Sequence, residues 1–211
     1  MNEEKNVYRF VAAVLMGLPE VGGEQRQRWI DHPRELQEAL SVLNRMPDLG
    51  LRTWKTIKLG TGLNNADDFC RAIKDCRMRI SDWANDIIGT PGFVVAAGGV
   101  EVDLVKVTVG ELGFKDGARR DQIYARAKEL GLELCPPEVG PQLRLQYKDQ
   151  PNGEWIIIGM KPIRHSDGNL SVFNVEHNDR GQWLDGNGGS PDYISSAGNR
   201  WLFVRPRKCQ K

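Results

Sequence analysis

After Phe93, the chain alternates short runs of β-branched and aromatic residues with segments rich in Gly, Pro and Asn. This alternation restricts the fold more than any other feature, because such runs favour strands and such segments favour turns. Residues 120–131 instead carry apolar side chains at helical spacing. We therefore expect one α+β domain over residues 91–211. Its strand-like runs lie at 100–109, 143–147, 155–160, 170–175 and 201–204, with hairpin-turn compositions at 150–153 and 166–169.

Residues 1–50 predict a helical N-terminal segment. Apolar side chains recur every three or four positions at 8–16 and again at 36–43, after Pro33. The glycine pair at 22–23 interrupts this pattern between the two stretches.

Residues 51–90 predict a small strand–helix–helix unit, with its strand at 56–59. Asn64 or Asn65 is expected to cap the first helix and Ser81 the second, because these side chains accept hydrogen bonds from free backbone N–H groups. The second helix has Trp83, Ile87 and Ile88 on one side.

Charge and hydropathy exclude several classes of partner. The net charge is +1, so no strong overall field attracts nucleic acid or an anionic membrane. The basic side chains at 119–128 are offset by Asp121, Glu129 and Glu133, which argues against a nucleic-acid interface. No run of about 18 apolar residues is present, so we expect no membrane span.

The N-terminal residues and the cysteines indicate a compartment. Residues 1–5 carry no basic cluster, and Glu20 stands where a signal peptide has small residues for cleavage. The four cysteines form no CxxC pair, and no His lies at ligand spacing from them. We therefore expect a cytoplasmic protein with unpaired thiols and no metal site.

The chain carries no recognisable catalytic motif. The glycine pair at 60–62 lacks the third glycine and the Lys-Ser/Thr pair of phosphate-binding loops, so no cofactor is expected. His165 with Asp167, or His177 with Asp179, could form an acid–base pair. The alternative to a binding function is therefore a small hydrolase or nucleic-acid-acting enzyme that uses one of these pairs.

The segment 182–205 has the composition of a binding surface. Gly, Asn, Asp, Ser and Tyr residues lie between Trp183 and the strand-like run at 201–204. Tyr provides rigid contact area, while Ser, Gly and Asn provide adaptable hydrogen bonds. No Lys or Glu occurs between Glu176 and Lys208.

Several stretches resemble a module of bacterial proteins, namely residues 56–62, 81–87, 132–147 and 153–155. Those proteins end, as this chain does, in Trp-Leu, a variable loop and an Arg-aromatic-x-Phe-Val-Arg sequence. Over 53–207 the chain therefore resembles the variable proteins of diversity-generating retroelements. In these systems a reverse transcriptase copies a template with errors at adenines and rewrites the 3′ end of the target gene.

The resemblance implies a C-type-lectin fold that displays mutated side chains. Replacement of adenines in AAC-type codons gives Asn, Asp, Ser, Gly and Tyr but never Lys or Glu, which agrees with the segment before Lys208. The implied invariant scaffold is Trp183, Pro191, Trp201, Phe203 and Val204. The implied ligand-binding residues are Asp185, Asn187, Gly188, Gly189, Ser190, Asp192, Tyr193, Ile194, Ser195, Ser196, Gly198 and Asn199.

Calcium and sugar binding are not implied. The tripeptide at 150–152 resembles the Pro-centred calcium motif of C-type lectins, but no Trp-Asn-Asp sequence follows it on a neighbouring strand. We therefore expect an α+β protein with a C-type-lectin-like domain at 91–211, preceded by a helical N-terminal region. Its expected function is the non-enzymatic, hypervariable binding of a protein or other macromolecular ligand through the loop at 185–199.

Overall fold

The computed structural model describes residues 23–35 and 51–207. The chain divides into two compact units, Met1–Gly50 and Leu51–Lys211. In the first unit the described residues include helix α2 (Gly23–Asp31), while the helices expected at 8–16 and 36–43 lie outside the described residues. Within the described ranges, no helix is long and apolar enough to cross a membrane.

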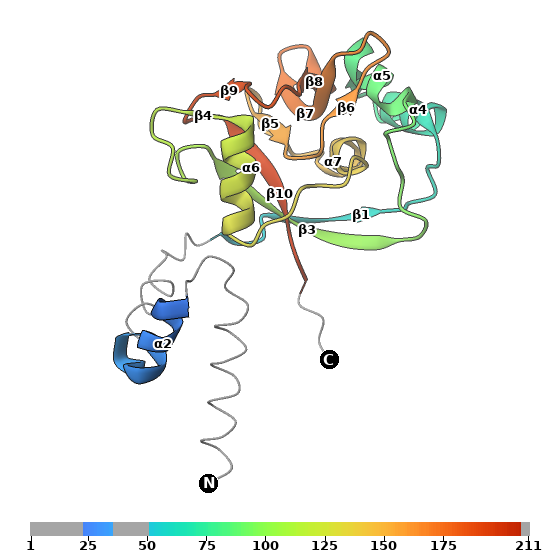
Figure 1. Ribbon diagram of the computed structural model, residues 1–211. Coiled ribbons are helices and arrows are strands. Elements are labelled where there is room, and N and C mark those ends of the chain that lie inside the picture. Colours follow the sequence, from blue (N-terminus) through green and yellow to red (C-terminus); the bar gives the residue numbers. More distant parts are fainter. Residues whose placement is uncertain (1–22, 36–50, 208–211) are drawn as a thin grey trace. The chain divides into compact units, whose positions relative to one another are not determined.

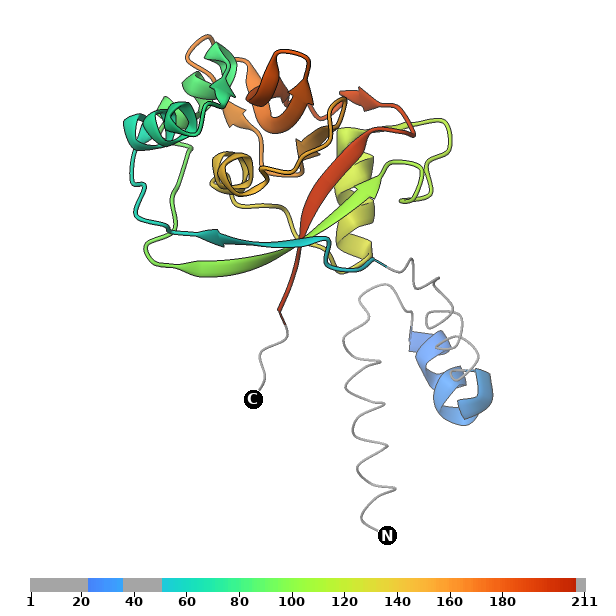
Figure 2. The same cartoon turned by 180° about the vertical axis from the view of Figure 1, so that it is seen from behind.

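The second unit is built on a mixed eight-stranded sheet that curls into a half-barrel (Figures 1 and 2). The strand order is β1–β3–β10–β5–β7–β8–β2, and β6 pairs with β7. Neighbouring strands are antiparallel except β10 with β5 and β2 with β8, which are parallel. The strands are β1 (Lys55–Leu59), β2 (Arg79–Ile80), β3 (Val100–Thr108), β5 (Trp155–Ile158), β6 (Ile163–Arg164), β7 (Leu170–Asn178), β8 (Gly181–Gly188) and β10 (Arg200–Arg205).

Four helices and a second, two-stranded sheet complete this unit. The helices are α4 (Ala66–Asp75), α5 (Asp82–Gly89), α6 (Arg120–Glu129) and α7 (Val139–Gln146), and the small sheet pairs β4 (Ala118–Arg119) with β9 (Ile194–Ser195). Helix α7 lies inside the curl of the large sheet, where it contacts β1, β7 and β8. Helices α4 and α5 lie together at the end of the sheet that β8 and β2 form.

The core has apolar layers on both faces of the sheet. On one face α7 approaches β7 so closely that a Cβ on Gly140 would lie 2.5 Å from the ring of Phe173. On the other face Tyr124 of α6 packs edge-on against Trp201 and Phe203, with ring centroids 5.8 and 6.2 Å apart. The central strands are therefore buried almost continuously, as expected where both faces of a sheet are covered.

Most of the predicted elements are confirmed. The strands expected at 56–59, 100–109, 155–160, 170–175 and 201–204 are β1, β3, β5, β7 and β10, and the helix expected at 120–131 is α6. Asn65 caps α4 by accepting a 3.0 Å hydrogen bond from the N–H of Asp68. Ser81 caps α5 in the same way, with a 3.1 Å bond from the N–H of Ala84.

The strand predicted at 143–147 is wrong, because residues 143–146 form the last turn of α7 and Tyr147 is its C-cap. Residues 139–144 are all buried, so α7 lacks the one-sided apolar pattern by which an amphipathic helix is recognised. The alternation within 143–147 was therefore misleading. Residues 150–153 consequently connect a helix to β5 and do not form a hairpin turn between two strands. The hairpin turn expected at 166–169 is confirmed between β6 and β7.

Residues 51–90 share the sheet and the core of the residues that follow them. Strand β1 pairs with β3, and the short β2 pairs with β8. The boundary expected near residue 90 therefore lies within one compact unit, Leu51–Lys211. The expected α+β class is confirmed for this unit as a curled mixed sheet with few helices.

A side chain covers the outer edge of β1 near the C-terminal end of the strand, at Lys58. The Nε2 atom of Gln146 donates a 2.8 Å hydrogen bond to the carbonyl of Lys58, and its Oε1 atom accepts a 2.9 Å bond from the Lys58 N–H. The amide of Gln146 therefore pairs with Lys58 as the backbone of a neighbouring strand would.

Candidate ligand-binding groove

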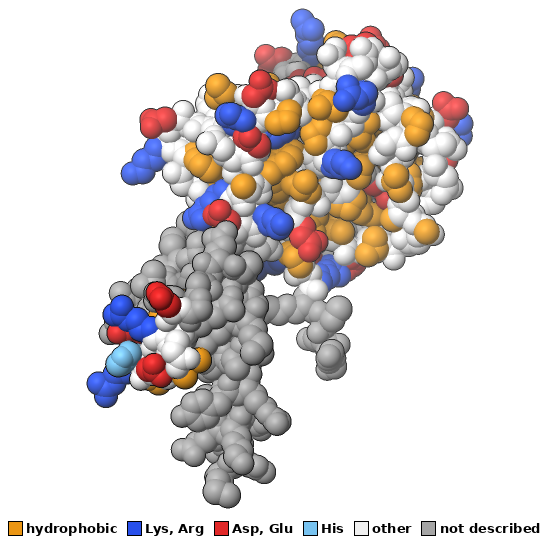
Figure 3. Space-filling view, viewed as in Figure 1, with side chains coloured by type: hydrophobic (Ala, Val, Ile, Leu, Met, Phe, Trp, Pro, Cys, Tyr) orange, Lys and Arg blue, Asp and Glu red, His pale blue; other side chains and the backbone are white. Residues whose placement is uncertain are grey.

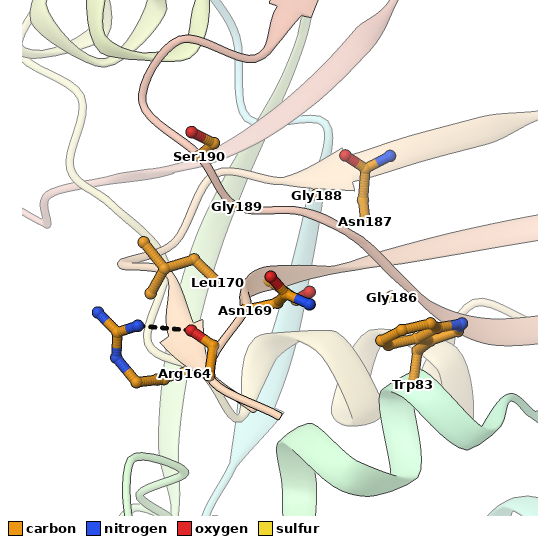
Figure 4. A pocket seen from close by; sticks show the side chains of 11 residues that line it. Trp83, Arg164, Asn169, Leu170, Gly186, Asn187, Gly188, Gly189 and Ser190 are labelled. Atoms are coloured by element: carbon orange, nitrogen blue, oxygen red, sulfur yellow. Dashed lines mark hydrogen bonds between the residues drawn. The ribbon is translucent and has the colours of Figure 1, made fainter. Parts of the chain in front are cut away.

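An open cavity of about 520 Å³ lies where α5, the β6–β7 turn and the end of β8 meet (Figure 4). We call it the groove. Four glycines and several polar side chains form most of its surface, together with one indole and one guanidinium group. Its lining residues are Trp83, Arg164, Gly168, Asn169, Leu170, Ser171, Gly186, Asn187, Gly188, Gly189 and Ser190.

Trp83 provides the aromatic side of the groove. It lies in the first turn of α5 and is 54% exposed, while Ile87 and Ile88 further along the helix are buried. Gly186 of β8 allows this approach, because a Cβ on Gly186 would lie only 2.8 Å from the Cβ of Trp83. The indole therefore points away from the core. This differs from the sequence-based expectation, which placed Trp83 on the same side of the helix as Ile87 and Ile88.

Figure 3 shows other apolar side chains gathered on the face viewed in Figure 1. The large apolar side chains of the second unit that are exposed are Trp83, Val94, Val100, Leu134 and Ile194. Of these, Trp83 alone lines the groove among the described residues.

A buried histidine supports the indole from behind. The ring of His165 lies edge-on to Trp83 with centroids 5.2 Å apart, and its side chain is completely buried. Its Nδ1 atom lies 2.7 Å from Oδ2 of Asp86, which also accepts hydrogen bonds from the N–H and hydroxyl of Ser166. The hydrogen bond from His165 is the largest cause that lowers the pKa of Asp86 below its ordinary value. This network fixes the place of the β6–β7 turn against α5.

The glycines determine how closely the chain segments approach one another in the groove. The N–H of Gly189 donates a 2.7 Å hydrogen bond to the carbonyl of Leu170. A Cβ on Gly189 would lie 2.7 Å from backbone atoms of Leu170 and Ser171, so no other residue fits there without movement of the backbone. At Gly198, by contrast, a Cβ would meet nothing within 4 Å.

Arg120 holds the loop that follows β8. Its side chain is almost fully buried, and its Nη2 atom donates to the carbonyl of Gly188. Its guanidinium carbon lies 5.4 Å from the ring centre of Tyr193 and 4.9 Å from that of Trp201. The backbone N–H of Arg120 also donates a 2.9 Å hydrogen bond to the carbonyl of Tyr193. Residues 188–193 are therefore tied to the start of α6 by main-chain and side-chain bonds.

Three carboxylates, which we call the rim aspartates, are each bonded to a residue that lines the groove. Asp167 accepts bonds of 2.9 and 2.8 Å from the N–H and the side-chain amide of Asn169. Asp185 accepts a 2.7 Å bond from the N–H of Gly186. Asp192 accepts a bond from the hydroxyl of Ser190. These hydrogen bonds lower the pKa of Asp167 and of Asp192 below the ordinary value, so both carboxyl groups are ionised at neutral pH.

The structure brings only part of the predicted ligand-binding set to the groove. Four members line it (Asn187, Gly188, Gly189 and Ser190), and two supply rim aspartates (Asp185 and Asp192). Tyr193 packs on Arg120, and Ile194 and Ser195 form β9, where Ile194 is exposed and Ser195 is buried. Ser196, Gly198 and Asn199 belong to the turn before β10, which bonds to residues 109–110.

In neither of the two proposed acid–base pairs does the described histidine bond to its aspartate. His165 contacts Asp86, while Asp167 accepts from Asn169. The Nδ1 atom of His177 lies 2.6 Å from the carbonyl of Gln150, and Asp179 accepts a 3.0 Å bond from Asn152. The described residues also contain no cluster of three or more His, Cys, Asp or Glu residues placed to hold a metal ion.

Comparisons with known proteins give no relative. No protein-family model, no curated protein and no solved structure matches this chain.

Proposed function

We propose that the protein is a non-enzymatic binding protein whose ligand face is the groove and the neighbouring loop at 188–193. The observation that carries this proposal is the overlap between two independent features. The segment before the last strand has the composition of a binding surface, and Asn187, Gly188, Gly189 and Ser190 of that segment line the groove.

The chemistry of the groove supports binding over catalysis. Among the described residues that line it there is no His, Cys, Lys, Asp or Glu, and no described hydrogen bond joins its two serines, Ser171 and Ser190, to a histidine that could activate them. An exposed indole, two amide side chains and glycine backbone groups are instead typical of recognition surfaces.

We further propose that this face is diversified by a retroelement and that the unit 51–211 is a C-type-lectin-like domain. The absence of Lys and Glu between Glu176 and Lys208 supports diversification from adenine-containing codons. The curled mixed sheet with short helices supports the domain type. The free thiols of Cys70, Cys76 and Cys135 support a reducing compartment such as the cytoplasm.

The space around each residue then decides which positions diversification can use and which must stay constant. Gly189 and Ser195 are buried, and Gly189 has no room for a side chain. The variable surface would therefore consist of the other ten residues of the predicted set, with Gly189 and Ser195 kept constant.

Two experiments test these proposals separately. The DNA around the gene is sequenced for a near-copy of the codons for 180–205 that differs at adenines and lies beside a reverse-transcriptase gene. Its absence would remove the retroelement proposal and leave the binding proposal intact.

The binding proposal is tested by selecting an unbiased displayed peptide library on the full chain, with counter-selection on the Trp83→Ala variant. Recovery of peptides that bind the wild type but not this variant is the expected result. If repeated selections yield no such peptides, the groove is not a ligand-binding surface for protein segments.

A further inference from the structure

The 188–193 loop is held to the rest of the domain through its main chain. Three of its carbonyl groups, those of residues 188, 191 and 193, accept hydrogen bonds from Arg120 or Asp121. The Nη2 atom of Arg120 donates to the first of them. The N–H of Asp121 donates to the second over 3.1 Å, and the N–H of Arg120 donates to the third over 2.9 Å. These bonds use carbonyl groups, which every type of residue carries.

The position of Arg120 and Asp121 at the start of α6 explains why they bind carbonyls. The first N–H groups of a helix have no partner within the helix and need acceptors from elsewhere. Among the described residues no side chain accepts from the N–H of Arg120 or of Asp121, and both donate to the loop instead. The loop therefore satisfies backbone groups that α6 would otherwise leave without partners.

The side chain of Arg120 is itself fixed by groups outside the loop. It is 1% exposed, and its Nη1 atom donates a 3.1 Å hydrogen bond to the hydroxyl of Tyr124, which donates to the carbonyl of Met160 over 2.7 Å. Its guanidinium carbon lies 4.9 Å from the ring centre of Trp201 in β10. None of the ion pairs among the described residues includes Arg120. A guanidinium buried without a carboxylate needs neutral acceptors, and the carbonyl of Gly188 is one of them.

The exposed side chains of the same segment make few bonds. Ser190, Asp192 and Ile194 are exposed, and Ile194 is exposed by 73%. The one described side-chain bond among these three joins Ser190 to Asp192, so it ties neither of them to the rest of the domain. The anchors of the loop are thus separate from the side chains that it presents to solvent.

We propose that Arg120 positions the ligand face by fixing the backbone of the 188–193 loop, so that the loop keeps one shape when its exposed side chains change. Different side chains at 190, 192 and 194 then alter which ligand is bound without reorganising the surface that presents them. This inference rests on the proposed binding function and adds the residue that keeps its binding face ordered.

Amide hydrogen exchange at residues 120 and 121 tests this inference, because both N–H groups lie outside the loop and donate to it. The full chain is compared with a loop variant that combines Ser190→Asn, Asp192→Ser and Ile194→Ser, and with Arg120→Met. Each exchange rate is divided by the rate expected for an unstructured peptide of the same sequence, which gives a protection factor. Amides in the interior of α6 and in β7 are the internal reference, since their loss of protection would indicate unfolding of the whole domain.

We expect the loop variant to change protection at residues 120 and 121 by less than about threefold, because the carbonyl anchors remain. Arg120→Met should reduce protection at Asp121 by at least about tenfold while the reference amides keep theirs, because the loop loses its anchor at Gly188. A loss in the loop variant as large as in Arg120→Met would overturn the inference. Full protection of Asp121 in Arg120→Met would overturn it as well.

Arg126 of the same helix provides the matched control. Its guanidinium also donates to a main-chain carbonyl, that of Leu112 over 3.2 Å, and to Glu129, but not to the loop. Arg126→Met should therefore leave protection at residues 120 and 121 unchanged. An equal loss in Arg126→Met would mean that any weakening of α6 frees the loop, and the special role of Arg120 would be refuted.

A milder variant replaces Arg120→Met if that protein does not fold. Tyr124→Phe removes the hydroxyl that accepts from Nη1 of Arg120 and keeps the aromatic ring. It should lower protection at Asp121 in the same direction but by a smaller factor. Unchanged protection in this variant would then count against the inference.

Ligand binding separates the inference from the proposed function. With a Trp83-dependent peptide from the library, Arg120→Met should raise the Kd at least roughly fivefold, whereas Arg126→Met should not. Normal binding by Arg120→Met would overturn the inference and leave the binding function intact. If the library yields no Trp83-dependent peptide, the proposed function fails, and the exchange data still decide whether Arg120 fixes the loop.

Discussion

His165 lies edge-on against the indole of Trp83, and its Nδ1 atom is held 2.7 Å from the carboxylate of Asp86. The two partners of this contact come from distant parts of the chain, since Asp86 and His165 are 79 residues apart. A buried ring that is itself fixed by a carboxylate holds the exposed indole in one orientation. A binding surface that is already ordered loses less conformational entropy when a ligand arrives.

Replacement of Trp83 by Ala should weaken ligand binding strongly and affect folding little. A central tryptophan commonly contributes a large share of the binding energy, so we expect at least a tenfold rise in Kd, roughly 1.4 kcal/mol or more. Trp83 is 54% exposed and Ala keeps the Cβ that packs on Gly186, so the Tm should change by only a few degrees. Titration calorimetry with a library-selected peptide and thermal unfolding measure the two effects.

Val94→Ala is the control for this substitution, because Val94 is 63% exposed and does not line the groove. It should leave the Kd unchanged. A Trp83→Ala protein that binds normally but unfolds at a much lower temperature would show that the indole has a structural role only.

Two glycines of the predicted variable surface should respond differently to the same substitution. Gly189→Ala places a methyl group 2.7 Å from the backbone of Leu170 and Ser171 and should reduce the free energy of unfolding by about 1–3 kcal/mol. Gly198→Ala meets no atom within 4 Å and should be neutral or stabilise the fold by up to about 1 kcal/mol. Urea unfolding of both variants gives the comparison, and equal losses would refute the steric argument.

Arg120→Met should destabilise the loop after β8. The substitution keeps an apolar stem of similar length but removes the donor to the carbonyl of Gly188, which should cost about 1–3 kcal/mol in urea unfolding. Arg119→Met is the neighbouring control: Arg119 is exposed and bonds to Asp121 at the surface, so its loss should stay within about 0.5 kcal/mol. Similar values for the two variants would mean that the buried guanidinium does not hold the loop.

The stability of the protein below about pH 4 should depend on Asp86. The pKa of Asp86 in the folded chain is lower than its ordinary value of 3.8, chiefly because His165 bonds to the carboxylate. Its ionised form therefore stabilises the fold above pH 3.8, and this contribution is lost as the pH falls through the lower folded pKa. Asp86→Asn should make the fall in Tm on acidification shallower, whereas Asp149→Asn should retain the wild-type slope. The same fall of Tm with decreasing pH in the wild type and both variants would show that Asp86 does not contribute to acid sensitivity.

Much of the fold could be predicted because most of its longer strands have a recognisable local sequence pattern. The runs that became β3, β5, β7 and β10 are rich in β-branched and aromatic residues and are bounded by turn residues. Helix α7 could not be recognised in this way, since a helix that is buried on most sides has no polar face to set its period. The pairing of β2 with β8 involves only two residues of each strand, so no local sequence pattern predicts it.

The residues of the candidate site also fall into two groups, those that local sequence indicates and those that only tertiary packing brings to the groove. Composition indicated the contiguous segment that carries Asn187, Gly188, Gly189 and Ser190, and the resemblance to retroelement variable proteins implied the individual residues. The indole that lies opposite was missed, since Trp83 reaches the groove only through the packing of α5 on β8. The partner of His165 was missed for a similar reason: the nearest carboxylate in sequence, Asp167, turns toward Asn169 instead.

The pairing of Gln146 with both backbone groups of Lys58 has a consequence for how the chain behaves among copies of itself. An uncovered outer strand invites the strand of another molecule to add to the sheet, which is a common route to aggregation. The amide of Gln146 occupies the donor and the acceptor that such an intruding strand would need at Lys58. When many copies of the protein are close together, the hydrogen-bonding groups of Lys58, near the C-terminal end of this edge strand, are therefore already occupied.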